Sequence, residues 1–180
     1  MQQNIRKNSF LHEFVSKKET KELTLYALAL FTLPLFPLNQ LIVGTLINAM
    51  LIKSAITYKT KKVFLLSLIP STAVIAGGVL FANLTPQILL MLPFIWLGNF
   101  ALMFLMRRIH SEKKKDYALF ALLSSSVKTM LLFSFAFVFY SQALVPIVFL
   151  TMFGLLQFVT AMSGAIVVFG ANKLAPKFKV

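Results

Sequence analysis

The composition of this 180-residue chain excludes an ordinary soluble domain, because 58% of its residues are hydrophobic and only 13% are charged, whereas soluble domains carry about 25% charged residues. The absence of cysteine excludes disulfides, thiol chemistry and cysteine-ligated metals. The net charge of +13 would suit nucleic-acid binding, but the positions of the charges favour a membrane protein.

Apolar runs follow a polar amino-terminal segment. Residues 1–22 are polar and basic and lack the apolar core and cleavage site of a secretory signal, so we expect a retained cytoplasmic segment, with an interfacial helix as one possible form. Since about 20 apolar residues cross a bilayer as a helix, the sequence predicts an all-α integral membrane protein with a six-helix membrane domain over residues 23–172. Residues 173–180 would be a cytoplasmic tail. The six runs cover residues 23–36, 41–58, 63–84, 87–106, 117–140 and 143–171.

The basic residues fall on alternate connections between these runs. They lie at the amino terminus, at the end of the second run, and after the fourth and sixth runs, while the turns after the first, third and fifth runs carry no charge. The positive-inside rule then places both termini in the cytoplasm. Topology and attraction to anionic lipids account for this charge, so we expect the lipid bilayer, and no nucleic acid, as its partner.

Lys128 is the exception, because it lies midway along the fifth run. An ionisable side chain at that depth costs a few kcal/mol on insertion scales and by default marks a functional site. All five acidic residues lie in segments predicted to be cytoplasmic: Glu13, Glu19, Glu22, Glu112 and Asp116. An ammonium without a counter-ion must lose its proton, reach water or meet an anionic ligand. We favour a ligand carboxylate or phosphate; hydrogen bonds to carbonyls and nearby amides are the alternative.

Three amide side chains are predicted at the depth of Lys128. Counting about 1.5 Å per residue from the outer turns places Asn48, Asn99 and Gln157 near the midplane, with Thr160 on the same helix face as Gln157. These amides could orient a ligand in a shared cavity. Hydrogen bonding between helices is the alternative role for such residues.

Four further residues have two possible roles each. Trp96 is too deep for the interfacial aromatic belt and could stack on a ring-bearing ligand or simply pack. Gln40, at the outer mouth, could gate the cavity or belong to the turn. Ala27 and Ala29 allow close helix contact, as packing first and as a surface for a partner second.

The sequence argues against several classes of enzyme. It lacks GxxxxGK[ST], HExxH and GxSxG, and both histidines, His12 and His110, lie in segments predicted to be cytoplasmic. We therefore expect a protein that is not an enzyme, with no ATPase motif, metal or cofactor of its own.

Four stretches carry a resemblance to a known family: residues 37–52 (PLNQLIVGTLINAMLI), 92–104 (LPFIWLGNFALMF), 125–133 (SSVKTMLLF) and 155–167 (LLQFVTAMSGAIV). With the predicted helices, they resemble the substrate-binding S components of energy-coupling-factor (ECF) vitamin transporters. The resemblance implies a six-helix bundle in the plasma membrane of a bacterium or archaeon. Such a bundle captures a vitamin or precursor from outside and docks on a coupling subunit carried by two ATPase subunits. The family often shows an Ala-xxx-Ala docking face on its first helix, where this chain has Ala27, Ala29 and then Phe31.

Three functions follow from these observations. The first is a high-affinity binding subunit for a small anionic solute, bound by Lys128 and oriented by the amides. The second is a stand-alone secondary carrier, although the chain shows neither internal repeats nor half-helices. The third is a structural or regulatory membrane subunit in which Lys128 pairs with an acid of a partner protein.

Overall fold

The computed structural model describes residues 17–58, 61–78, 84–111 and 116–174. Within these ranges every regular element is a helix and none is a strand, which confirms the predicted all-α class. The predicted interfacial helix and tail lie mostly outside the described residues. The elements are α2 (Lys17–Thr32), the 3₁₀ helix η1 (Leu33–Leu35), α3 (Gln40–Thr57), the 3₁₀ helix η2 (Lys61–Leu68), α4 (Ile69–Gly77), α5 (Thr85–Ser111), α6 (Tyr117–Ser141), α7 (Val148–Phe153) and α8 (Leu155–Leu174).

Four helical stretches are long and apolar enough to cross a membrane, judged by length and composition. They cover residues 40–57, 85–108, 117–141 and 148–174, which correspond to the second, fourth, fifth and sixth predicted runs. Large apolar side chains are exposed on the outside of these helices, such as Met130 (69%) and Ile166 (64%). The helices are therefore compatible with a membrane-embedded protein.

The first and third predicted runs do not form single long helices, because proline and glycine interrupt them. Pro34 lies in η1, where the α-helical pattern of α2 has ended. The third run begins as η2 and becomes α-helical only at Ile69, with Pro70 in the first turn of α4. Gly78 then ends α4 with a positive φ of 61°, a left-handed conformation that favours glycine.

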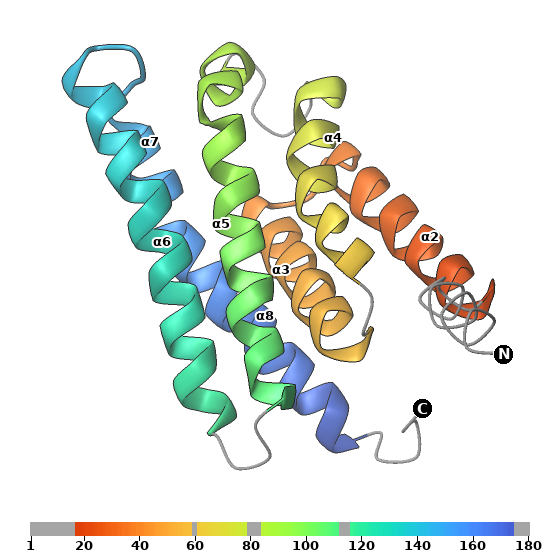
Figure 1. Cartoon of the computed structure of the whole chain (residues 1–180). Helices are drawn as coiled ribbons and strands as arrows, with labels where there is room; N and C mark the ends of the chain where they lie inside the picture. Colours follow the sequence, from red (N-terminus) through yellow and green to blue (C-terminus); the bar gives the residue numbers. More distant parts are fainter. Residues whose placement is uncertain (1–16, 59–60, 79–83, 112–115, 175–180) are drawn as a thin grey trace, which may run out of the picture.

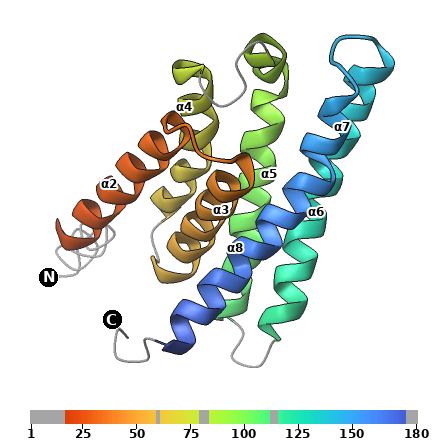
Figure 2. The same cartoon turned by 180° about the vertical axis from the view of Figure 1, so that it is seen from behind.

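The long sixth run is divided at Gly154 into α7 and α8. A Cβ atom at this position would lie 2.5 Å from the Leu150 carbonyl oxygen, so the tight junction between α7 and α8 requires glycine. The consecutive segments α2–η1, α3, η2–α4, α5, α6 and α7–α8 run in alternate directions (Figures 1 and 2). The closest helix pairs are α3 with α8 and α5 with α6.

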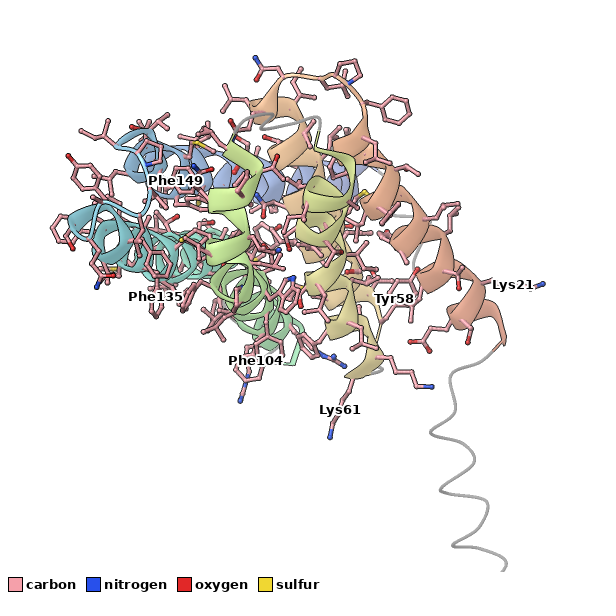
Figure 3. All side chains as sticks on the ribbon, turned by 90° about the horizontal axis from the view of Figure 1, so that it is seen from above. Lys21, Tyr58, Lys61, Phe104, Phe135 and Phe149 are labelled. Atoms are coloured by element: carbon pink, nitrogen blue, oxygen red, sulfur yellow. The ribbon has the colours of Figure 1, made fainter. Side chains whose placement is uncertain are left out.

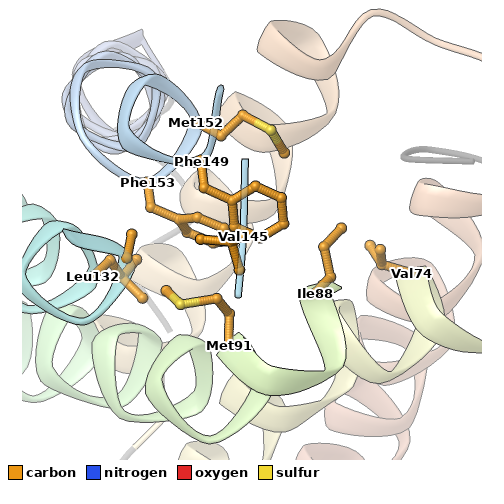
Figure 4. Close-up of a cluster of buried hydrophobic side chains, with 9 residues drawn as sticks. Val74, Ile88, Met91, Leu132, Val145, Phe149, Met152 and Phe153 are labelled. Carbon is orange, nitrogen blue, oxygen red and sulfur yellow. The ribbon is translucent and has the colours of Figure 1, made fainter. Parts of the chain in front are cut away.

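Three clusters of buried apolar side chains hold the helices together. One joins α4, α5, α6 and α7, and Figure 4 shows Phe149 and Phe153 at its centre. A second joins α3, α5, α6 and α8, and a third packs α2 and η2 against α3 and α5. Seen from above in Figure 3, Lys21 and Lys61 instead reach away from the helices. The polar residues described below lie between the three apolar clusters.

Candidate functional site

The side chain of Lys128 lies inside the bundle, where α6 meets α3 and α5. Only 2% of the residue is exposed. Its Nζ atom donates a hydrogen bond to Asn48 Oδ1 at 2.7 Å and another to Asn99 Oδ1 at 2.8 Å. Asn48 and Asn99 are themselves almost fully buried. The structure thus brings together the lysine and two of the three amides that depth counting placed at one level.

The amide nitrogens of the two asparagines donate hydrogen bonds to groups other than Lys128. Asn99 Nδ2 donates to the Ser67 carbonyl oxygen at 3.1 Å, and a carbonyl can only accept. Asn48 Nδ2 donates to Thr160 Oγ1 at 3.2 Å, and the Thr160 hydroxyl donates to the Gln157 carbonyl at 3.2 Å. Because a backbone carbonyl ends the chain of hydrogen bonds on each side, neither asparagine can rotate its amide by 180° without losing bonds.

The Ser67 carbonyl is available because of the local backbone. In a 3₁₀ helix this carbonyl would accept from the N–H three residues later, which here is Pro70. Proline has no N–H, so that bond cannot form. The 3₁₀ conformation of η2 and the following proline thereby help fix the orientation of Asn99, and through it the oxygen offered to Lys128.

The side-chain amides of Asn48 and Asn99 therefore both point their oxygen atoms at Lys128. An ammonium group has three N–H donors, and two of them are used by Asn48 and Asn99. In the described part of the chain no carboxylate pairs with this lysine, and no other hydrogen bond of its Nζ atom is formed. When Lys128 is charged, the two oxygens stabilise its ammonium group without neutralising it.

Close packing of α3 and α8 holds Asn48 against Thr160. Gly164 makes this possible, because a Cβ atom there would lie 2.8 Å from the Ala49 backbone nitrogen and 2.9 Å from Asn48 Cβ. On α5, Gly98 faces the Lys128 stem, since a Cβ atom there would lie 3.4 Å from Lys128 Cγ. Sequence reasoning did not identify Gly98, Gly164 or Ser67 as part of the site, and small residues recurring on facing helices were the available signal.

Lys128 lies in the wall of a cavity of about 90 Å³. Five of the six predicted ligand-binding residues line it: Gln40, Asn48, Asn99, Lys128 and Gln157. Gln157 is half-buried and its side chain forms no hydrogen bond with the described residues, so its amide is available to a ligand. Ser71 and Thr160 complete the polar part of the wall.

Trp96 is the predicted residue that the cavity wall does not include. It is half-buried on α5, and its indole N–H has no acceptor among the described residues. The structure shows no contact between Trp96 and the cavity, and its two predicted roles, stacking on a ligand and packing, both stay predictions. Ala27 and Ala29 are half-buried on α2, and Ala27 packs against the cluster around Leu30.

The polar part of the cavity wall consists of Lys128 with amide and hydroxyl side chains. Among the described residues, no three His, Cys, Asp or Glu side chains gather as metal ligands do. No family model matches the chain, and no curated protein or solved structure matches it. The residues around Lys128 are therefore the direct evidence for what the protein binds.

Proposed function

We propose that this protein is a membrane-embedded binding subunit that captures a small anionic solute, a vitamin or vitamin precursor, for ATP-driven uptake. The observation that carries the proposal is the buried Lys128 in the cavity wall, which has two amide oxygens but no carboxylate partner among the described residues. The resemblance to ECF S components supports the same function. Binding would be the only chemistry of this subunit.

Simple electrostatics favours an anion in this cavity. Two unit charges about 4 Å apart attract by about 4 kcal/mol at an effective dielectric constant of 20. A neutral hydrogen bond contributes about 1 kcal/mol. An anionic group beside Lys128 would therefore gain more free energy than a neutral one of the same shape, and it would supply the counter-charge that the described residues leave out.

In the proposed topology six segments cross the plasma membrane of a bacterium or archaeon, with α2–η1 and η2–α4 as the two spans beyond the long apolar helices. The alternate directions of the segments in Figure 1 support this topology. So does the position of exposed basic residues near the starts of α2 and η2 and near the ends of α5 and α8: Lys21, Lys61, Arg108 and Lys173. Both termini would then be cytoplasmic.

The proposed partners are a transmembrane coupling subunit and two ATPase subunits, because the chain carries no ATP-binding motif of its own. The first helix is the proposed docking surface. It exposes Leu25 (66%) and Leu28 (58%) beside the small residues Ala27 and Ala29, as a helix that packs on another membrane helix would.

The experiment that tests this function is purification of the tagged protein from its own membranes, without added ligand. We expect a coupling subunit and two ATPase subunits to co-purify, and denaturation to release a small organic anion that mass spectrometry identifies. Release of no small molecule, together with co-purification of an acidic membrane partner, would instead support a structural subunit.

A further inference from the structure

The cavity beside Lys128 is elongated along α3. Five residues on one face of this helix line it: Gln40, Val43, Gly44, Ile47 and Asn48. Their spacing is the i, i+3, i+4, i+7 and i+8 pattern of one helical face. At 1.5 Å per residue, Gln40 lies about 12 Å along the axis from Asn48. The cavity therefore has an inner end at Lys128 and Asn48 and an outer end at Gln40.

The rest of the wall is largely apolar. Figure 4 shows four of its side chains, Val74, Ile88, Met152 and Phe153, which come from α4, α5 and α7. The volume of about 90 Å³ is smaller than that of a cavity that binds benzene, which measures about 150 Å³. The enclosed part of the cavity is thus smaller than a cavity that holds a benzene ring, and a thin chain fits it better.

Two donors in the cavity wall are available to a ligand. In its ammonium form, Lys128 has one N–H left after bonding Asn48 and Asn99. Gln157 has its side-chain amide, and it lies one helical turn from Thr160, which bonds Asn48. Two donors and one positive charge match a carboxylate, which has two oxygens and one negative charge. A phosphate has three acceptor oxygens and about two negative charges, for which this part of the wall offers too few donors.

We infer that the ligand is a short, unbranched monocarboxylate, bound with its carboxylate at Lys128 and Gln157 and its alkyl chain along α3 toward Gln40. The inference rests on the proposed function and narrows it: the solute is a small acid, such as a precursor, and not a complete ring-bearing vitamin. The chain would lie against the apolar cluster of Figure 4.

Isothermal titration of the detergent-purified protein with butyrate tests the inference. We expect butyrate to bind, and 1-butanol and inorganic phosphate to show no measurable binding. The branched acid pivalate and the ring acid benzoate should bind more weakly by about tenfold or more, which is the discrimination that a tight apolar pocket gives. Laurate is the probe for a fatty acid that enters from the bilayer. Because the cavity is small, we expect laurate also to bind more weakly than butyrate.

Three variants locate the binding. Lys128→Met leaves an unbranched side chain one atom shorter and removes the ammonium group, and it should weaken butyrate binding by more than about tenfold. Lys53→Met is the matched control, because Lys53 bonds Asn172 and does not line the cavity; it should bind butyrate like the wild type. Leu156→Ala removes side-chain atoms from the wall and so enlarges the cavity. This variant should bind pivalate more tightly than the wild type does, and a misfolded protein cannot show such a gain in affinity.

Two results would contradict the inference in different ways. If benzoate or a larger ring-bearing anion binds tightly and butyrate does not, while Lys128→Met abolishes that binding, the short-acid assignment is wrong and the proposed function stands. If no anion binds in a manner that depends on Lys128, both the short-acid assignment and the proposed function are wrong.

Discussion

At the scale of single residues, the site depends on the direction of its hydrogen bonds. Counting along the sequence placed Lys128, Asn48 and Asn99 at one depth, and the structure joins them. The direction of each amide was not predictable, because it is set by the Ser67 and Gln157 backbone carbonyls. Which helix faces meet is decided by tertiary packing, and for the same reason depth alone could not show that Trp96 lies outside the cavity wall.

Replacing Asn99 by aspartate supplies the charge that the ligand would otherwise bring. The new carboxylate would occupy the position of Oδ1, 2.8 Å from Lys128 Nζ. We expect Asn99→Asp to lower the affinity for an anion by more than about tenfold, because the lysine is already neutralised. Titration of the solute that co-purifies with the wild type measures the effect.

The matched control for this change is Asn172→Asp. Asn172 also accepts a hydrogen bond from a lysine, Lys53, but both residues lie outside the cavity wall. Asn172→Asp should leave the affinity unchanged. Equal affinities in wild type and Asn99→Asp would show that the charge of Lys128 does not bind the solute.

At the scale of helices, the sequence predicted the uninterrupted elements well and the interrupted ones poorly. The fifth run, residues 117–140, agrees with α6 to within one residue. By contrast, the run over residues 63–84 contains the change from η2 to α4 and the end of α4 at Gly77. A 3₁₀ helix and an α-helix can have the same apolar composition, so hydropathy cannot distinguish them. In the sequence, only Pro70 and the Gly77-Gly78 pair indicated an interruption.

The crossing of α3 and α8 should be sensitive to one methyl group. In Gly164→Ala the new Cβ atom would lie 2.8 Å from Ala49 N and 3.0 Å from the Thr45 carbonyl oxygen. Both are backbone atoms of α3, so the helices must separate. We expect a loss of about 1–3 kcal/mol in the free energy of unfolding and weaker solute binding, because Asn48 moves away from Thr160.

Gly170→Ala is the control on the same helix, since no atom lies within 4 Å of a Cβ atom there. It should leave stability unchanged or raise it by up to about 1 kcal/mol, because alanine favours the helix. Denaturant unfolding monitored by circular dichroism compares the two variants. Equal stabilities of Gly164→Ala and Gly170→Ala would mean that α3 and α8 are not packed closely.

At the scale of the whole molecule, the proposed topology assigns each end of the bundle to one side of the membrane. The natural chain has no cysteine, so single cysteines can report the sides without background. We expect Lys61→Cys and Lys173→Cys to react with an impermeant maleimide only after the membrane is opened, and Ser141→Cys to react in intact cells. These residues are exposed in the structure. Reaction of Lys61→Cys and Ser141→Cys from the same side would contradict six crossings.

The interior of the molecule gives the most direct test, because one buried lysine accounts for its proposed selectivity. Native mass spectrometry of the protein purified without added ligand shows whether a solute is bound and to what fraction of the molecules. We predict a wild-type species that carries one small anion, the same species for Lys53→Met, and a bare protein for Lys128→Met. If Lys128→Met retains the solute to the same extent as the wild type, Lys128 does not hold an anion and the central claim is wrong.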